Sequence, residues 1–144
     1  MNDLQSQIQR MQKAMTEKIQ KADKDAARYV IMSCAKIEQT AKRIMRDSPT
    51  NSAVTYGKRG HHPSYPGNPP APDTGTLLQS ITHSVEVDSK GNPTGYVGSI
   101  LRNPDYPRFL EYGTSKMKPR PWLSTSIALC HSYMANLARE IFKR

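Results

Sequence analysis

The feature that most restricts the fold of this chain is a run of apolar residues, spaced three or four positions apart, in its first 47 residues. The first of these residues are Leu4, Ile8, Met11, Met15, Ile19, Ala22, Ala26 and Val30. Such spacing places side chains on one face of an α-helix. The pattern continues to Ile44 and ends at Ser48-Pro49, because a residue before proline is disfavoured in the α region. The sequence therefore predicts a long amphipathic helix over residues 1–47.

An unbroken helix of this length would be roughly 65 Å long at ~1.5 Å per residue, which exceeds the diameter of a small domain. The chain has 144 residues, which suits a single domain spanning residues 1–144. The sequence allows two arrangements of this helix. Either the helix breaks near Lys21 to Asp25, or its first half projects onto a neighbouring subunit.

Residues 48–74 have a different composition, with six prolines, three glycines and almost no aliphatic side chains. This composition predicts a long loop. Structureless connections longer than about 12 to 15 residues are uncommon in compact domains and are often functional. We therefore expect a partner-contacting arm, whose candidate contact residues are Lys58, Arg59, His61, His62 and Tyr65.

Residues 75–120 are predicted to form a small antiparallel β-sheet region. Thr76 and Gln79 have the spacing of a capping box, which suggests one short helical turn. Apolar and polar residues then alternate from 81 to 88, residues 89–93 form a turn, and residues 94–100 return as a second strand. The result is a β-hairpin. For residues 108–112 the sequence leaves a strand and a helical turn both open.

Residues 121–144 are predicted to form the C-terminal helix. Its apolar stripe consists of Leu123, Ile127, Cys130, Met134, Leu137 and Ile141. Pro121 suits the first turn of a helix, where its missing N–H costs nothing. The expected fold is α+β, with the long N-terminal helix and the C-terminal helix packed on a small antiparallel sheet and a long Pro-rich loop between them.

The composition indicates a basic chain that gains from association. Its 21 Lys and Arg outnumber 12 Asp and Glu, which gives a net charge of +9 and favours polyanions or acidic protein faces as neighbours. The basic residues are spread along the chain, so no segment resembles a nucleic-acid-binding tail. The apolar fraction of 36% permits only a modest core, so oligomerisation would add stability.

The two cysteines and the N-terminal segment bear on the cellular compartment. Cys34 and Cys130 each lie on the apolar stripe of a predicted helix, where a reduced cysteine behaves as a small hydrophobic residue. Residues 1–10 are polar, and the sequence has no apolar run of 18 residues, so neither a signal peptide nor a membrane span is expected. We expect the chain to be made in the cytoplasm.

Three segments, in this order, resemble one protein family. They are Pro70–Ile81 with its Thr-Gly turn and Ser-Ile entry to a strand, Phe109–Thr114 (FLEYGT), and Lys118–Leu123 (KPRPWL). They are similar to segments of the tail-component family of long-tailed double-stranded DNA phages, described as tail-completion or neck proteins. Trp122 stands where that family is expected to have Phe.

The resemblance implies a ring-forming virion structural protein at the phage neck, which joins the DNA-filled head to the tail. Six copies are the number we expect. The implied partners are the adjacent neck connector or stopper proteins and the tail terminator or tail-tube proteins. Genomic DNA would pass through the channel without sequence-specific binding, and the protein would reside in the virion after assembly in the host cytoplasm.

The candidate ring-interface residues come from two of these segments and are Glu111, Tyr112, Gly113, Thr114, Arg120 and Trp122. Glu111 either accepts backbone N–H groups, pairs with an arginine of a neighbouring subunit such as Arg120 or Arg108, or is an ordinary surface carboxylate beside a turn. Gly113 is expected to adopt a positive φ. Trp122 is expected at an exposed corner, where aromatic side chains commonly stabilise interfaces.

The sequence gives little support for catalysis, and no enzyme function, cofactor or metal is predicted. It contains no G-x-S-x-G, H-E-x-x-H, P-loop or G-x-G-x-x-G motif. His61 and His62 are adjacent, and sequence neighbours rarely point the same way, so a solvated loop is favoured over a metal site. His83 lies on the apolar face of a strand and is expected to be a hydrogen-bonded core histidine.

Two functions of other classes remain as alternatives. One is a basic nucleic-acid-binding module, which would bind duplex DNA with a steep salt dependence. The other is a small metal-dependent hydrolase that uses His61 and His62. The basic side chains of the long helix alternate with acidic ones, so a solvated face explains most of them. Any that line a ring channel would make weak, salt-sensitive contacts with DNA.

Overall fold

The computed structural model of the chain describes residues 2–103 and 105–143. Its elements are, in order, α1 (Asn2–Arg46), α2 (Thr76–Ser80), β1 (Ile81–Val87), β2 (Pro93–Ser99), α3 (Asp105–Tyr112) and α4 (Leu123–Ile141). The two long helices and the two-stranded antiparallel sheet confirm the predicted α+β class.

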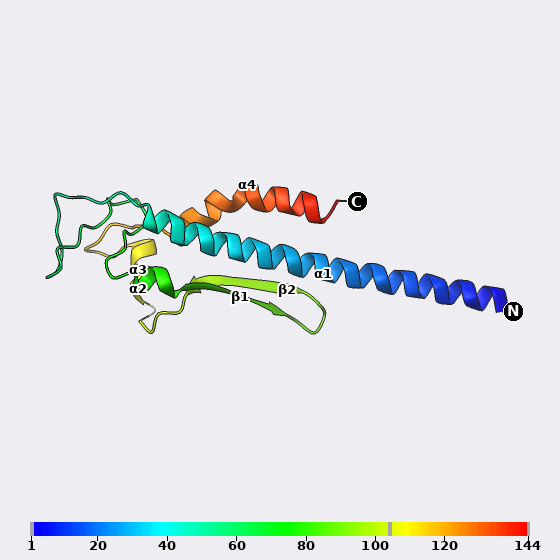
Figure 1. Cartoon of the computed structure of the whole chain (residues 1–144). Coiled ribbons are helices and arrows are strands. Elements are labelled where there is room, and N and C mark those ends of the chain that lie inside the picture. The colour runs from blue at the N-terminus through cyan, green and yellow to red at the C-terminus, as the bar shows by residue number, and fades with distance from the viewer. Residues whose placement is uncertain (1, 104, 144) are drawn as a thin grey trace.

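Helix α1 is the central element of the fold. The β1–β2 hairpin packs along one side of it and α4 along another, and the long loop gathers at the end opposite the N-terminus (Figure 1). The helix is unbroken for 45 residues. The predicted break near Lys21 to Asp25 is therefore wrong, since the stripe keeps the same helical face throughout. The first half instead projects beyond the rest of the chain, and its side chains from Asp3 to Lys24 are exposed except for Ser6.

The hairpin pairs Ile81 with Ser99 at one end and Val87 with Pro93 at the other. The inward face predicted for β1 is confirmed for its first part, because Ile81 is buried and His83 and Val85 are half-buried. Val87 was expected on the same face but is 57% exposed, since it lies at the tip of the hairpin. At the turn, the carboxylate of Asp88 accepts the backbone N–H groups of Lys90 and Asn92, both at 2.8 Å.

Strand β2 approaches α1 so closely that one position requires glycine. A Cβ added at Gly95 would collide with the Cys34 sulfur and lie 2.8 Å from Cγ1 of Val30. Glycine in a strand interior often marks such a close approach of backbone to a neighbouring element. The hairpin therefore lies directly on the covered half of α1.

Two predicted helix starts differ from the structure. The N-cap of α2 is Gly75, with φ 79°, and the hydroxyl of Thr74 accepts the backbone N–H of Thr76 at 3.3 Å. The expected capping box at Thr76 is therefore wrong, because the chain enters α2 in a left-handed conformation one residue earlier. Helix α4 begins at Leu123, so Pro121 lies before the helix and not in its first turn. The segment left open between strand and helical turn, residues 108–112, belongs to α3.

The main core cluster lies where α1 meets α2, β1, α3 and the start of α4. It consists of Ala41, Met45, Leu77, Ile81, Leu110 and Trp122.

Cys34 and Cys130 are free and buried, as predicted. The thiol of Cys130 lies 3.3 Å from Oγ1 of Thr40 and so contributes to the contact between α4 and α1. Burial raises the pKa of the Cys34 thiol, which keeps it protonated. Ile127, expected on the inner stripe of α4, is 42% exposed.

Candidate functional site

The candidate site is the corner between α3 and α4 together with the loop that lies against it. Its first component is Glu111, in the last turn of α3. One carboxylate oxygen accepts the backbone N–H groups of Trp122 at 2.8 Å and Leu123 at 2.9 Å. The other accepts the backbone N–H of Ser124 at 3.0 Å and also its hydroxyl. The first N–H groups of a helix have no partner within the helix, so Glu111 acts as the cap that α4 otherwise lacks.

The surroundings of Glu111 favour its charged form. Partial burial alone would raise its pKa, but the hydrogen bonds from Ser124 and from the backbone of Leu123, Ser124 and Trp122 outweigh burial and lower the pKa. A negative charge at a helix N-terminus is also stabilised by the helix dipole. Of the three roles considered for Glu111, acceptance of backbone N–H groups is confirmed. Pairing of Glu111 with an arginine of a neighbouring subunit stays a prediction.

Gly113 and Thr114 form the turn that leaves α3. Gly113 has the positive φ predicted for it, 76°, and donates its backbone N–H to the carbonyl oxygen of Phe109 at 2.8 Å. A Cβ at this position would lie 2.7 Å from the carbonyl oxygen of Met117. Thr114 closes the turn, because its hydroxyl accepts the backbone N–H groups of Lys116 and Met117. These two residues set the direction in which the chain returns toward α4.

Arg120 joins this corner to the loop of residues 48–74. Its backbone N–H donates to the carbonyl oxygen of Leu110 at 2.7 Å. Its guanidinium donates twice to the carbonyl oxygen of Ser64, from Nε and Nη2, each at 3.2 Å. The side chain is half-buried. Arg120 is thus occupied within its own chain.

Trp122 occupies a different environment from the one predicted. The expectation of an exposed corner is wrong, because the side chain is 3% exposed and belongs to the core cluster. Its indole N–H donates to the carbonyl oxygen of Pro107 at 3.2 Å. The chain reverses at Gly113, and Arg120 pairs with Leu110, so Trp122 is carried inward against α3. Tyr112, by contrast, is 76% exposed on the outside of the same corner.

The loop of residues 48–74 has local structure of its own. Tyr56 and His61 exchange backbone hydrogen bonds of 2.8 and 3.0 Å, and this pairing closes a short turn. Lys58 and Arg59 lie at the tip of that turn and are exposed, and so is Tyr65. The loop that carries the basic residues predicted to contact a partner lies at the end of the molecule opposite the N-terminus of α1 (Figure 1).

The two loop histidines have different partners. His61 lies 4.0 Å from a carboxylate oxygen of Asp73, and Nδ1 of His62 lies 3.0 Å from the carbonyl oxygen of Val54. Over the described ranges, no group of three or more His, Cys, Asp or Glu side chains could hold a metal ion.

A cavity of about 350 Å³ lies between the loop, α3 and the turn after Gly113. Its lining includes the cationic side chains of Lys116 and Arg120, His61, and the aromatic rings of Tyr56 and Tyr106. Burial, with a smaller effect from the charge of Asp73, raises the pKa of Tyr106. Such a lining suits an acidic or aromatic side chain from another protein. Tyr56, Tyr106 and Lys116 could not be predicted from the sequence, because no local pattern links Tyr56 to residues that lie 50 and 60 positions further along the chain.

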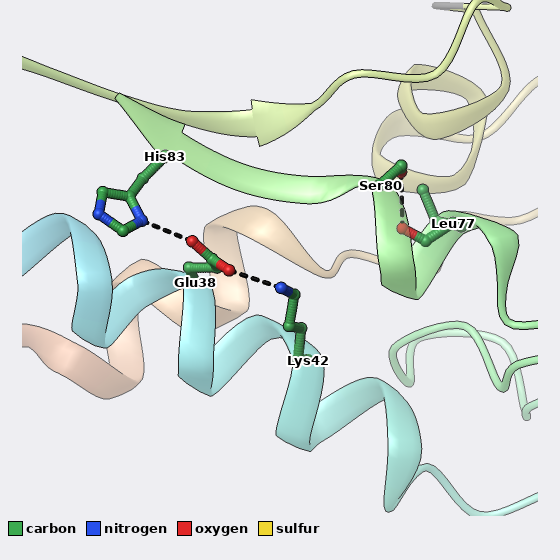
Figure 2. Close-up of polar contacts among 5 residues, drawn as sticks. All are labelled: Glu38, Lys42, Leu77, Ser80 and His83. Carbon is green, nitrogen blue, oxygen red and sulfur yellow. Dashed lines mark hydrogen bonds and ion pairs between the residues drawn. The ribbon is translucent and has the colours of Figure 1, made fainter. Parts of the chain in front are cut away.

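A second polar cluster connects β1 to α1 (Figure 2). Glu38 lies between His83 and Lys42, with Oε2 2.5 Å from Nδ1 of His83 and Oε1 2.5 Å from Nζ of Lys42. The hydrogen bonds from Lys42 and then His83 lower the pKa of Glu38. His83 is hydrogen-bonded as predicted, although its side chain remains 30% exposed. In the described part of the chain no hydroxyl or thiol hydrogen-bonds to the His83 ring, so the cluster lacks the nucleophile–base contact of covalent catalysis.

Comparison with models of protein families, with curated proteins and with solved structures found no match to this chain. Among the described helices, none is both long enough and apolar enough to cross a membrane.

Proposed function

We propose that this chain is a structural protein of the neck of a long-tailed double-stranded DNA phage, where its copies form a ring that joins the head to the tail. The proposal rests first on the three segments that resemble the tail-completion family. Residues 70–81 supply Leu77 and Ile81 to the main core cluster, residues 109–114 supply Leu110, and residues 118–123 supply Trp122. Segments separated by up to 37 positions therefore contribute to one core cluster, as expected of a pattern shared by a protein family.

The surface also supports a protein that works by association. Large apolar side chains are exposed at several places, including Tyr112 at 76%, Ile100 at 73% and Leu4 at 66%. Contiguous exposed apolar side chains often mark protein interfaces, and Leu4, Ile8 and Met11 follow one another along α1. In the proposed ring, Tyr112 and Thr114 contact the adjacent subunit. The corner between α3 and α4, on which they lie, is stabilised by Glu111, Gly113, Arg120 and Trp122. The function is structural, and no catalytic step is assigned.

The turn of Lys58 and Arg59, with His62 and Tyr65 beside it, contacts a neighbouring ring in this proposal. Its position at one end of the molecule suits contact along the axis of the neck (Figure 1). Six copies remain the expected number in the ring. The neighbours are then the connector or stopper proteins and the tail terminator or tail-tube proteins. The net charge of +9 suits a channel through which DNA passes with weak, salt-sensitive contacts.

Immunolabelling of virions tests this function. Antibody against the chain should label the neck, and virions without its gene should accumulate as separate heads and tails. Complementation with Lys58→Ala/Arg59→Ala should restore joining poorly, whereas the control Lys90→Ala on the exposed hairpin turn should restore it fully. Wild-type virions without label at the neck, or normally joined virions from the deletion, would refute the neck role.

A basic nucleic-acid-binding module is the second candidate, and one observation favours it. Arg10, Lys13, Lys21 and Lys24 are all exposed along the projecting half of α1. For this function, the logarithm of the duplex affinity should fall with the logarithm of salt concentration with a slope of about −0.9 for each phosphate neutralised. Weak binding at ~150 mM salt would instead favour the structural role.

A further inference from the structure

The first half of α1 carries an apolar stripe that no described part of the chain covers. Its side chains are Leu4 (66% exposed), Ile8 (46%), Met11 (65%), Met15 (60%) and Ile19 (60%). The contacts by which other parts of the chain cover α1 begin just beyond this segment. At the hairpin tip, a Cβ on Gly91 would lie 3.2 Å from the Asp23 carboxylate, and near the end of α4 the Phe142 ring lies 5.8 Å from the Tyr29 ring.

The exposed stripe continues the covered one without a change of face. Apolar or small residues repeat every 11 positions in steps of four, three and four, as Leu4-Ile8-Met11, Met15-Ile19-Ala22 and Ala26-Val30-Ser33. An 11-residue repeat is ~3.67 residues per turn, so it stays almost parallel to the helix axis. From Val30 onward the same face packs inside the domain. Residues 4–22 therefore present an apolar face like the one that packs inside the domain further along α1, but no described part of the chain packs against it.

The stripe is narrow. At ~100° per residue its members fall within about 80° of the helix circumference. A narrow stripe is typical of a helix–helix seam, whereas a helix lying on a membrane surface buries a broader apolar face. Within residues 4–22, the side chains on either side of the stripe are Gln5, Gln7, Gln12, Ala14, Thr16 and Lys18.

The distribution of charge favours a second copy as the occupant. Arg10, Lys13, Lys21 and Lys24 lie about 120° to 180° from the centre of the stripe, on the opposite face. Within residues 4–22 only Lys18 places a basic side chain at the border of the stripe, so two copies can meet through it with little repulsion between like charges. Glutamine amides both donate and accept hydrogen bonds, so a border rich in glutamine is complementary to itself. An acidic partner would instead call for a border rich in basic side chains.

We infer that residues 4–22 of α1 pack against the same segment of a second copy of this chain and form a helical bundle outside the domain. The stripe supplies the buried seam and the glutamines its border. In a neck ring this packing would link subunits, but it does not require the neck role. The virion labelling described above and a measurement on the purified chain therefore test two separate statements.

The test is the mass of the purified full-length chain by sedimentation equilibrium over a concentration series. The wild type should associate, and Ile8→Gln/Met11→Gln/Met15→Gln should dissociate to the 16.2 kDa monomer at concentrations at which the wild type remains associated. These side chains are exposed and glutamine is a good helix former, so the variant should keep its helical circular dichroism. The matched control Arg10→Gln/Lys13→Gln/Lys21→Gln changes the opposite face and should associate like the wild type.

Cysteine cross-linking locates the contact. Met11→Cys should form a disulfide-linked dimer on mild oxidation, whereas Lys13→Cys on the outer face should do so poorly, and the native cysteines are buried. A monomeric wild type at every concentration, or a seam variant that associates as strongly as the wild type, would overturn the inference. A monomer that binds vesicles of phosphatidylglycerol and phosphatidylcholine through the stripe would overturn it in favour of a membrane surface.

Discussion

Replacement of Glu111 should destabilise the whole domain, because this one carboxylate caps α4 from a different helix. It accepts three backbone N–H groups and the Ser124 hydroxyl. Loss of a capping side chain costs about 0.5 to 2 kcal/mol, and loss of a negative charge at a helix N-terminus costs ~0.3 to 1 kcal/mol. Glu111→Ala should therefore cost about 2 kcal/mol, and Glu111→Gln, which keeps one acceptor oxygen, about 1 kcal/mol.

The effect should also depend on pH. The folded-state pKa of Glu111 lies below its ordinary value of 4.5, so its stabilising contribution is present above that value and is lost as pH falls through the folded pKa. The difference in unfolding free energy between wild type and Glu111→Gln should be constant near neutral pH and should shrink below about pH 4.5. At neutral pH the melting temperature of Glu111→Ala should fall by roughly 4 to 8 °C.

Urea unfolding monitored by tryptophan fluorescence measures these changes. The chain has one tryptophan, Trp122, which is buried beside the cap. The matched control is Glu86→Gln, since Glu86 is exposed on β1. If Glu111→Gln and Glu86→Gln had the same midpoint at pH 7, or if their difference did not change with pH, the capping role would be refuted.

Three further changes should have distinct effects on stability. Gly113→Ala should lower the free energy of unfolding, measured with urea, by about 1 to 3 kcal/mol, because φ is 76° at this position and an added Cβ would meet the Met117 carbonyl oxygen. The control Gly98→Ala, where an added Cβ meets open space, should lower it little. Trp122→Ala should cost ~3 to 5 kcal/mol by far-UV circular dichroism, and a loss under 1 kcal/mol would contradict its placement in the core. Glu38→Gln should lower the free energy of unfolding by about 1 to 2 kcal/mol at pH 7. Because the pKa of Glu38 is lowered in the folded chain, this loss should become progressively smaller below pH 4.5. An equal loss at pH 3 would argue against the His83 and Lys42 contacts.

The elements whose periodicity is local could be predicted from the sequence. The apolar spacing of residues 1–47 predicted α1, and the alternation from Ile81 predicted the hairpin, because both patterns follow directly from backbone geometry. Helix α3 was left open, since it has only eight residues and contains Pro107, which is tolerated near a helix start.

The environment of the site residues could not be predicted in the same way. Trp122 is buried because Gly113 reverses the chain and Arg120 pairs with Leu110, and neither event appears in the local pattern around residue 122. The start of α2 depended on the left-handed conformation of Gly75 rather than on the hydroxyl of Thr76. Glu111 was correctly considered as an acceptor of backbone N–H groups, but its partners lie 11 to 13 positions away.

The order of α1 and α4 along the chain has a consequence during synthesis. The face of α1 that α4 covers leaves the ribosome before α4 has been made. At ~5 to 20 residues per second, translation needs roughly 5 to 20 s to proceed from Arg46 to Ile141. During that interval the nascent chain exposes an apolar face on nearly its whole first helix. The packing of α4 on α1 can therefore form only after the last residues of α4 emerge from the ribosome, and until then this face of α1 is open to contacts with other chains.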